Sequence, residues 1–314
     1  MTTAQESPSS STRSYSSVAP QPSRRRRRST QGRLLYVLPA GVILATLAAY
    51  PLTQLVRMSV SEVTSATLST DWAFVRFQNF VHGWQQGDTQ NAMVNTAIFV
   101  VIVTALGLAG GFSAAIALRS NTKGSAILLG LMVFVWALPP VVNGSVWKFL
   151  LGDNGLFNSV IHLFGAPSFP FLYDPRFALL SVALVNSWAI IPFNALVFRA
   201  AILGIPAEVF EAAQLDGASA WQEIRHIMIA TVRPTTLVLA VLTIVYAFRS
   251  FDFIYVMTYG GPGKTTNTLP FLGYLQAFVR YDFGLGASTA IIAVLFVIVL
   301  AVVYARSVRK EELD

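Results

Sequence analysis

Long apolar stretches alternate with short polar segments along this chain. Stretches of about 20 or more mostly apolar residues, enough for a helix to cross the hydrocarbon core of a bilayer, lie at residues 34–56, 92–118, 126–147, 177–203, 233–257 and 286–305. The first stretch exceeds the roughly 7–15 residues of a signal-peptide core, so an uncleaved helix is favoured over a removed leader. The pattern predicts an all-α, polytopic membrane protein with six transmembrane helices.

Composition supports the membrane assignment and narrows the partners. Hydrophobic residues make up 54% of the chain and charged residues 12%, with a mean hydropathy of +0.58, whereas soluble domains carry roughly 25% charged residues. Five of the 22 Lys and Arg residues form the run Arg24–Arg28 directly before an apolar stretch. This position favours anionic lipid over nucleic acid as the partner of the basic run. The chain has no cysteine and only three dispersed histidines, which argues against a metal site.

Charge also predicts the topology and the segments. An arrangement with both termini on one side gathers fifteen of the 22 basic residues there, and the positive-inside rule makes that side cytoplasmic. Four segments follow. The first two are a disordered basic cytoplasmic tail (1–33) and a first transmembrane helix with an external loop (34–91). A core of five transmembrane helices (92–306) contains the cytoplasmic loop 204–235, and a cytoplasmic C-terminal tail (307–314) ends the chain.

The stretch TYGGPGKTTN at residues 258–267 looks like a nucleotide-binding loop. The phosphate-loop pattern G-x-x-x-x-G-K-[ST] requires a glycine where Thr258 stands, because that glycine opens the turn around the phosphates. The preceding apolar residues are long enough for a span, and the predicted topology places the loop outside the cell. We therefore interpret it as an external loop without ATP.

Several positions inside the predicted spans stand out. The pattern Gly107-x-x-x-Gly111 allows close approach of another helix, and ordinary packing is favoured over a special dimer motif. Pro139-Pro140 and Pro192 should kink their helices. Arg249 and Asp252 should pair, reach the interface or face a wet cavity, because a charge inside the bilayer is costly. No Asp or Glu lies in the other spans, which argues against a proton-coupled transporter.

The cytoplasmic loop GIPAEVFEAAQLDGASAWQEIRHIMIATVRPT predicts a helix, a glycine turn and a second helix. Pro206 suits a helix start, Asp216-Gly217 a stop, and Ser219 with Gln222 a capping box. An apolar stripe at helical spacing comprises Phe210, Ala213, Gly217, Trp221 and Ile224. From these residues alone the stripe fits a helix lying on the bilayer as well as one docking in a partner's groove.

The segment EAAQLDGASAWQEIRHIMIATVRP closely resembles the EAA loop of importer permeases of the ATP-binding cassette (ABC) class. The matching positions are Glu211, Ala212, Ala213, Asp216, Gly217, Ala218, Ile227 and Pro234. Two positions depart: Ile224 stands where the family usually has Phe, and Ala230 replaces a proline, which puts the local bend before the fifth span in doubt. The resemblance runs from about Asn91 to Tyr304, and residues 251–278 are similar to the carbohydrate branch.

This resemblance implies an ABC type I importer permease fold in a bacterial plasma (inner) membrane, and no enzyme activity of the chain itself. The implied partners are a homologous second permease subunit, a cytoplasmic ATPase dimer that binds ATP and Mg, and an extracytoplasmic sugar-binding lipoprotein. The chain itself would bind no cofactor. The Arg-rich tail resembles that of a permease subunit of actinobacterial trehalose importers, which makes trehalose the expected sugar. Permeases for another oligosaccharide or for glycerol phosphate stay open.

The resemblance also assigns residues. The ATPase contact would be Glu211, Ala212, Ala213, Asp216, Gly217 and Ala218, and the external gate loop Gly260, Gly261, Pro262 and Gly263. From position and chemistry, the substrate pathway would comprise Asn186, Trp188, Phe193, Asn194, Tyr246, Arg249, Ser250 and Asp252. The alternative function is a self-sufficient channel or secondary carrier. An intramembrane enzyme lacks support, because the spans hold no acid pair, HExxH or Ser/His arrangement.

Overall fold

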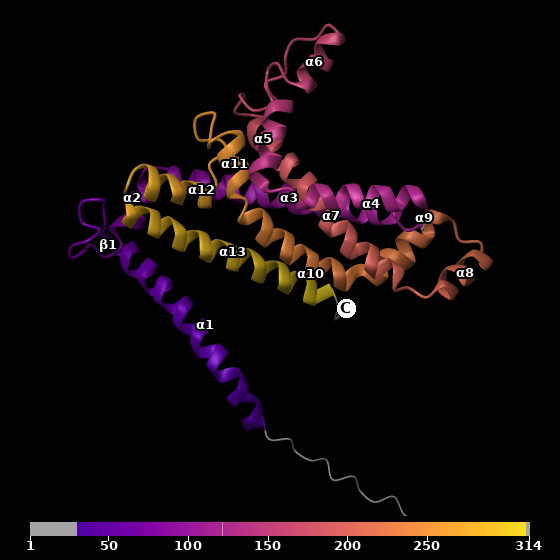
Figure 1. Ribbon diagram of the computed structural model, residues 1–314, viewed down its shortest axis with the longest axis horizontal. Coiled ribbons are helices and arrows are strands. Elements are labelled where there is room, and N and C mark those ends of the chain that lie inside the picture. The colour runs from indigo at the N-terminus through magenta and orange to yellow at the C-terminus, as the bar shows by residue number, and fades with distance from the viewer. Residues whose placement is uncertain (1–29, 121, 312–314) are drawn as a thin grey trace, which may run out of the picture. The chain divides into compact units, whose positions relative to one another are not determined.

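A computed structural model describes residues 30–120 and 122–311 of the chain. The chain divides into two compact units, Met1–Tyr50 and Pro51–Asp314. In the described range the first unit consists of the N-terminal part of helix α1 (Thr30–Ser59). The second unit contains the other helices and is coloured from purple to yellow in Figure 1. Of the predicted tails, residues 1–29 and 312–314 lie outside the described residues, whereas residues 30–33 belong to α1 and residues 307–311 to α13 (Phe283–Glu311).

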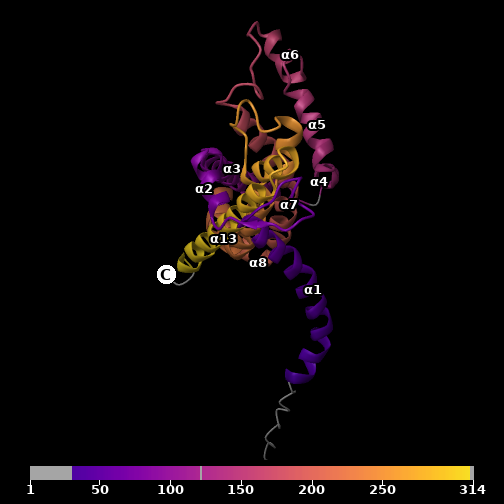
Figure 2. The same cartoon turned by 90° about the vertical axis from the view of Figure 1, so that its left-hand side faces the viewer.

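Four long helices form the centre of the second unit: α3 (Asp88–Ala117), α7 (Ala178–Leu203), α10 (Ile229–Phe248) and α13 (Phe283–Glu311). Helix α3 packs along α7, α10 contacts both, and α13 contacts α10, as Figures 1 and 2 show. Helices α3, α7 and α10 share a core that contains Val103, Ile190 and Ile244. Five described helices are long and apolar enough to cross a membrane, or six if one bent pair counts as a span. The all-α membrane fold is thus confirmed.

Glycines allow the close contact between α3 and α7. A Cβ atom at Gly111 would lie 2.5 Å from Cβ of Asn194 and 3.1 Å from the backbone nitrogen of Ala195. A Cβ atom at Gly107 would lie 2.9 Å from Cγ2 of Ile190. The Gly107-x-x-x-Gly111 pattern therefore serves helix packing within the chain, as predicted.

The predicted third span at 126–147 is a bent pair of helices in the structure, and the predicted kink at Pro139-Pro140 is a full break. The structure has two helices there, α4 (Lys123–Ala137) and α5 (Pro140–Leu150), bent by 103°. The residue before a proline is disfavoured in the helical region, and two prolines follow Leu138. Leu138 and Pro139 are accordingly extended, with ψ of 135° and 136°. The proline pair thus breaks the helix rather than only kinking it, whereas α7 continues through Pro192.

The predicted fifth span at 233–257 is wrong at both ends, since the observed span runs over Ala220–Phe248. A continuous helical segment starts earlier, with α9 (Ala220–Gln222) and the π-helical turn η1 (Glu223–Met228) leading into α10. It ends at Phe248, and α11 (Phe251–Met257) follows after a break. Ser250 lies at the break with ψ of 74°, and its hydroxyl accepts a 2.6 Å hydrogen bond from the Asn186 amide. Apolar residues flank the break on both sides, so hydropathy does not reveal it.

Short elements complete the second unit. Strands β1 (Ser61–Glu62) and β2 (Ala73–Phe74) pair antiparallel, with Ser61 opposite Phe74. The remaining helices are α2 (Gln78–Gln85), α6 (Leu156–Leu163), α8 (Ala207–Leu215), α12 (Leu269–Tyr274) and the π-helical turn η2 (Leu275–Val279). Helix α6 follows α5 and ends the segment drawn at the top of Figure 1.

Candidate coupling loop and substrate pathway

The loop after α7 folds into the predicted helix, glycine turn and second helix. Helix α8 ends at Leu215, and Gly217 takes a φ of +78°, a left-handed conformation that side chains rarely adopt. Ser219 and Gln222 form the predicted capping box: the Ser219 backbone N–H donates to Oε1 of Gln222 at 2.7 Å, and the Gln222 N–H donates to Oγ of Ser219 at 3.4 Å. The turn sets the angle between α8 and the second helix.

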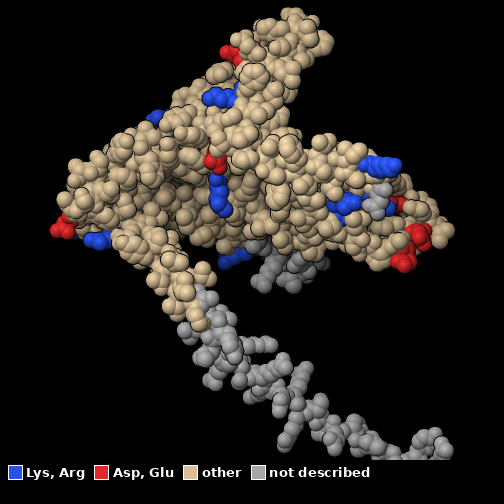
Figure 3. Space-filling model, in the orientation of Figure 1, with Lys and Arg blue, Asp and Glu red and all other residues tan. Residues whose placement is uncertain are grey.

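The residues expected to contact an ATPase are accessible in this chain. Glu211, Ala212, Asp216 and Gly217 are exposed, while Ala213 and Ala218 are half-buried. A hollow of about 310 Å³ is lined by Ala213, Asp216, Gly217, Ala218, Gln222, Glu223, His226 and Ile227. Figure 3 shows red and blue side chains gathered over α8 and α9 at this end, beside a broad uncharged surface. The loop therefore offers a small, acidic and solvent-facing contact surface.

The predicted apolar stripe does not form one face. Phe210 is buried, with the guanidinium carbon of Arg119 4.2 Å from its ring centroid. Trp221 instead is 66% exposed and Leu215 89% exposed. The reason is the turn at Gly217, which ends α8 before the second helix starts, so one helical periodicity does not run through both. Phe210 anchors the loop inward, and Trp221 faces outward.

Glu223 is a buried carboxylate that sequence reasoning did not single out. Its side chain is 9% exposed, and Oε2 lies 3.4 Å from Nη1 of Arg119. Nε2 of Gln214 donates to its other oxygen at 3.3 Å. The partner Arg119 stands 104 residues earlier in the chain, so no local pattern could reveal the pair.

The two asparagines of the predicted pathway lie in the packed interior. Asn186 and Asn194 are fully buried. The Asn186 amide donates to Oγ of Ser250 at 2.6 Å, and Oδ1 of Asn194 accepts from the Thr243 hydroxyl at 3.3 Å. Each keeps one buried polar atom without a protein partner, Oδ1 of Asn186 and Nδ2 of Asn194. Both asparagines therefore link α7 to the α10 segment and retain hydrogen-bonding capacity.

The predicted aromatic residues occupy the surroundings of α7. Trp188 is 37% exposed and lies edge-on to Trp147 with ring centroids 5.2 Å apart. Phe193 stacks on Trp136 at 5.7 Å, and Tyr246 is half-buried against the core. Of the three, Trp188 is the most exposed.

Arg249 and Asp252 form no ion pair with each other in the described part of the chain. Arg249 is exposed and lines a mostly apolar groove of about 510 Å³ together with Phe248, Tyr274 and Phe278. Asp252 is half-buried on α11. Of the eight predicted pathway residues, this groove includes Arg249 alone.

The glycine loop is tied to the first turn of α3. Gly260 and Gly263 have φ of +82° and +63°, while Gly261 and Pro262 are half-buried. Nζ of Lys264 pairs with Oδ1 of Asp88, and the Asn95 amide donates to the backbone oxygen of Lys264 at 3.1 Å. The lysine of GGPGKTT thus has a carboxylate partner within the chain.

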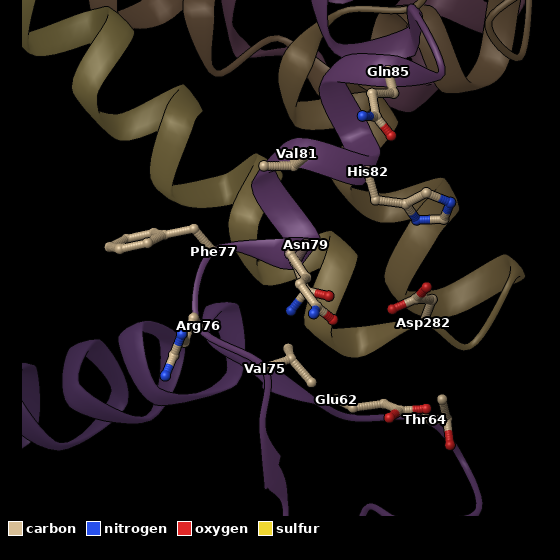
Figure 4. Close-up of a pocket in the computed structure, with 11 residues that line it drawn as sticks. Glu62, Thr64, Val75, Arg76, Phe77, Asn79, Val81, His82, Gln85 and Asp282 are labelled. Atoms are coloured by element: carbon tan, nitrogen blue, oxygen red, sulfur yellow. The ribbon is translucent and has the colours of Figure 1, made fainter.

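A groove of about 730 Å³ lies between the β1–β2 hairpin and α2. Figure 4 shows Phe77 and Val81 directed to the opposite side from His82 and Asp282. Sequence reasoning did not predict this groove, which depends on how residues 62–85 fold together and on the distant Asp282. No group of three or more metal-ligating side chains occurs among the residues for which the structure gives positions.

Comparison with protein families gives a match over residues 107–312 to the binding-protein-dependent transport system inner membrane components. The chain belongs to this family. The match starts at Gly107 in α3 and includes the whole EAA loop. The family that this loop suggested is therefore confirmed. This permease is accordingly a transport component of an ABC importer rather than an enzyme.

Two curated relatives match most of the permease. It is 28% identical over 232 residues to the trehalose/maltose transport system permease protein MalF of Thermococcus litoralis, covering 74% of this chain and 78% of the relative. It is 30% identical over 281 residues to the sn-glycerol-3-phosphate transport system permease protein UgpA of Agrobacterium fabrum, covering 88% and 95%.

A solved structure shares the fold of the permease. A chain from the crystal structure of a bacterial alginate ABC transporter in complex with an alginate pentasaccharide-bound periplasmic protein superposes with a TM-score of 0.75. The identity is 19%, and the match covers 89% of this chain and 95% of the other. At this identity the likeness concerns the fold alone, and it agrees with the predicted type I importer permease fold.

Proposed function

We propose that this chain is a transmembrane subunit of an ATP-driven sugar importer, with trehalose or a related disaccharide as the substrate. The observation that carries the proposal is the exposed loop Glu211–Gly217, held out from the bundle by the left-handed turn at Gly217. A solvent-facing acidic helix of this kind suits insertion into a cleft of an ATPase subunit. Both termini and this loop would then lie in the cytoplasm.

The complete importer would contain further chains. A homologous permease subunit would supply the second half of the pathway, and two ATPase subunits would bind ATP and Mg. An extracytoplasmic binding protein would deliver the sugar near the gate loop Gly260–Gly263. The groove beside α2 adjoins the same end of α3, which makes it part of the surface offered to that protein.

Several observations support a sugar as the cargo. The named relatives include a trehalose/maltose permease and a glycerol phosphate permease. Trp188 offers a partly exposed ring, and aromatic rings suit the apolar faces of sugars. Asn186 and Asn194 each keep a buried polar atom without a protein partner, and such atoms call for an explanation in a native structure. Sugar hydroxyls would supply the missing partners when the pathway opens.

Transport would follow from rigid-body alternating access. ATP-driven closure of the ATPase dimer would bring the coupling loops together and rotate the spans. The contacts Asn186–Ser250 and Asn194–Thr243 join α7 to the α10 segment, so their separation would expose both amides to the pathway. Sugar would bind the state with exposed amides more tightly than the closed state, and this difference in affinity would shift the population toward the open state.

The first test is purification of the chain from its native membrane in mild detergent, with mass spectrometry of the bound chains. We expect an ATPase, a second six-span permease and a lipoprotein. Proteoliposomes holding the purified complex should then take up labelled trehalose in preference to maltose or glycerol 3-phosphate, only with ATP inside. Flux through liposomes containing this chain alone would instead establish a channel or secondary carrier.

A second test addresses the pathway. Asn186→Ala and Asn194→Ala should reduce uptake, while Asn158→Ala serves as a control because Asn158 is a buried asparagine of α6, outside α7, and bonds to Gly152 and Phe169. Arg249→Ala tests whether the residue acts in the pathway or only lines the apolar groove: uptake should fall only in the first case. Unchanged uptake in the Asn186, Asn194 and Arg249 variants, at normal abundance, would remove these residues from the pathway.

A further inference from the structure

Arg119 contacts both helices of the coupling loop. It follows the C-terminal end of α3, and its guanidinium carbon lies 4.2 Å from the ring centroid of Phe210 on α8. Its Nη1 atom lies 3.4 Å from Oε2 of Glu223 on η1. One side chain of the bundle thus bridges the two helical arms on either side of the turn at Gly217.

The loop side of this contact is buried. Taken as whole residues, Phe210 and Glu223 are 8% and 7% exposed. A buried carboxylate requires charged or hydrogen-bonding partners, because loss of water is costly to the charged form. Gln214 supplies a second hydrogen bond to Glu223 at 3.3 Å. Arginine suits this place because its planar guanidinium can stack on a ring and pair with a carboxylate at the same time.

The bundle side of the contact is anchored as well. The backbone oxygen of Leu118, directly before Arg119, accepts from Nε of Arg199 on α7 at 2.9 Å. The same oxygen accepts from Oγ of Ser125 on α4 at 3.1 Å. The segment that carries Arg119 is therefore held by α7 and α4. Arg119 should move together with these helices.

These contacts differ from the apolar packing around them. Phe210 also belongs to a cluster with Phe198 and Met228, and apolar burial is non-directional. Hydrogen bonds and guanidinium–ring contacts have preferred geometries. The loop can therefore slide across the apolar cluster. The Arg119 contacts resist such a movement, so a displaced loop pulls α3 along.

We propose that Arg119 is a positioning residue that transmits movement of the coupling loop to α3 through Glu223 and Phe210. This inference rests on the proposed function, because it requires a loop moved by an ATPase. It predicts that loss of the Arg119 contacts separates ATP hydrolysis from sugar uptake without removing either the complex or the sugar site.

The experiment uses the complete complex in proteoliposomes and measures uptake per ATP hydrolysed. Arg119→Gln should lower this ratio by about tenfold, within the usual range of couplings between two sites, with unchanged abundance and unchanged KM for the sugar. Arg119→Lys, which keeps the charge but not the planar group, should give an intermediate ratio. Arg176→Gln is the control, since Arg176 pairs with Asp174 in a different loop.

A double variant tests whether the effect passes through Glu223. Glu223→Gln should lower the ratio, and Arg119→Gln combined with Glu223→Gln should lower it no further than the stronger single change, because residues that act through one contact are not additive. Fully additive losses would overturn the proposal. An unchanged ratio in Arg119→Gln, or a loss of uptake that only follows a loss of abundance, would overturn it too.

These outcomes are distinct from failure of the proposed function. If the wild-type chain purifies without an ATPase and transports alone, the importer assignment fails. If the wild-type complex couples hydrolysis to uptake and Arg119→Gln couples equally well, the importer stands and only the role of Arg119 fails.

Discussion

Lys264 donates a charged hydrogen bond to Asp88 and thereby joins the glycine loop to the first turn of α3. The two residues are 176 positions apart. Asp88 is 5% exposed, and its other oxygen lies 3.7 Å from Nη1 of Arg280. The carboxylate also stands at the positive end of the α3 helix dipole. One buried acid therefore holds two cations and a helix start at the same place.

Asp88 should matter more to stability than either of its cations. Asp88→Asn removes the charge that all three features share, and we expect a loss of about 1–2 kcal/mol. Lys264→Met should cost less than about 1 kcal/mol, because Lys264 is half exposed and Arg280 keeps the acid paired. Thermal unfolding of both variants in detergent tests this order. Equal losses in the two variants would show that Asp88 acts only through Lys264.

Gly111 should not tolerate even one methyl group. The Cβ of Gly111→Ala would lie 2.5 Å from Cβ of Asn194, so α3 and α7 would have to separate, at a cost of about 1–3 kcal/mol. Gly130→Ala is the matched control, because Gly130 also lies in a helix and a Cβ there meets nothing within 4 Å. Melting temperature and membrane abundance should fall for the first variant alone. A stable Gly111→Ala protein would contradict the packing described for these helices.

Gly217 offers a way to separate backbone conformation from steric contact. Gly217 has a φ of +78°, and open space surrounds the position of a Cβ atom. Gly217→Val should abolish uptake at normal abundance, because a β-branched residue resists the left-handed turn that aims α8. Gly217→Asn should retain most uptake, since Asn adopts this conformation more readily. Loss of uptake in both variants would show that an ATPase surface approaches the glycine itself.

Glu211→Lys probes the same loop by charge. Glu211 is exposed, so the change should leave folding intact and reduce uptake by weakening the contact with an ATPase. Membrane abundance and uptake are measured together. Reduced abundance at a proportional loss of uptake would indicate a folding role for Glu211.

The pair formed by Asp174 and Arg176 should add no pH dependence to stability between pH 5 and 8. Hydrogen bonds from Arg176 lower the pKa of the Asp174 carboxyl from 3.8 to about 2. A lowered pKa means that the stabilisation is complete above pH 3.8 and is lost as the pH falls through about 2. The difference in melting temperature between wild type and Asp174→Asn should therefore be the same at pH 5 and pH 8.

Local patterns predicted the elements whose causes are local. The capping box of Ser219 and Gln222 and the stop at Gly217 depend on neighbouring residues, and all are present in the structure. The EAA loop led to the correct family for the same reason. Hydropathy located each membrane segment but not its breaks, since Arg249 and Ser250 interrupt a run that stays apolar on both sides.

Contacts between distant segments could not be predicted from such patterns. Glu223 pairs with Arg119, Asn186 with Ser250 and Lys264 with Asp88, and each pair depends on how helices meet in space. The predicted pathway set consequently separated into different environments. Its asparagines lie in the interior, while Arg249 lines an apolar groove.

The bend between α4 and α5 affects how this chain is accommodated in a bilayer. Helix α4 has 15 residues and is about 22 Å long at 1.5 Å per residue, which is shorter than the roughly 30 Å hydrocarbon core. Irregular backbone at membrane depth persists only when protein or water covers it. The backbone at the Leu138–Pro139 junction therefore needs protein or water around it while the chain is inserted and assembled. The chain should be more prone to degradation when it is synthesised without the subunits that complete the importer.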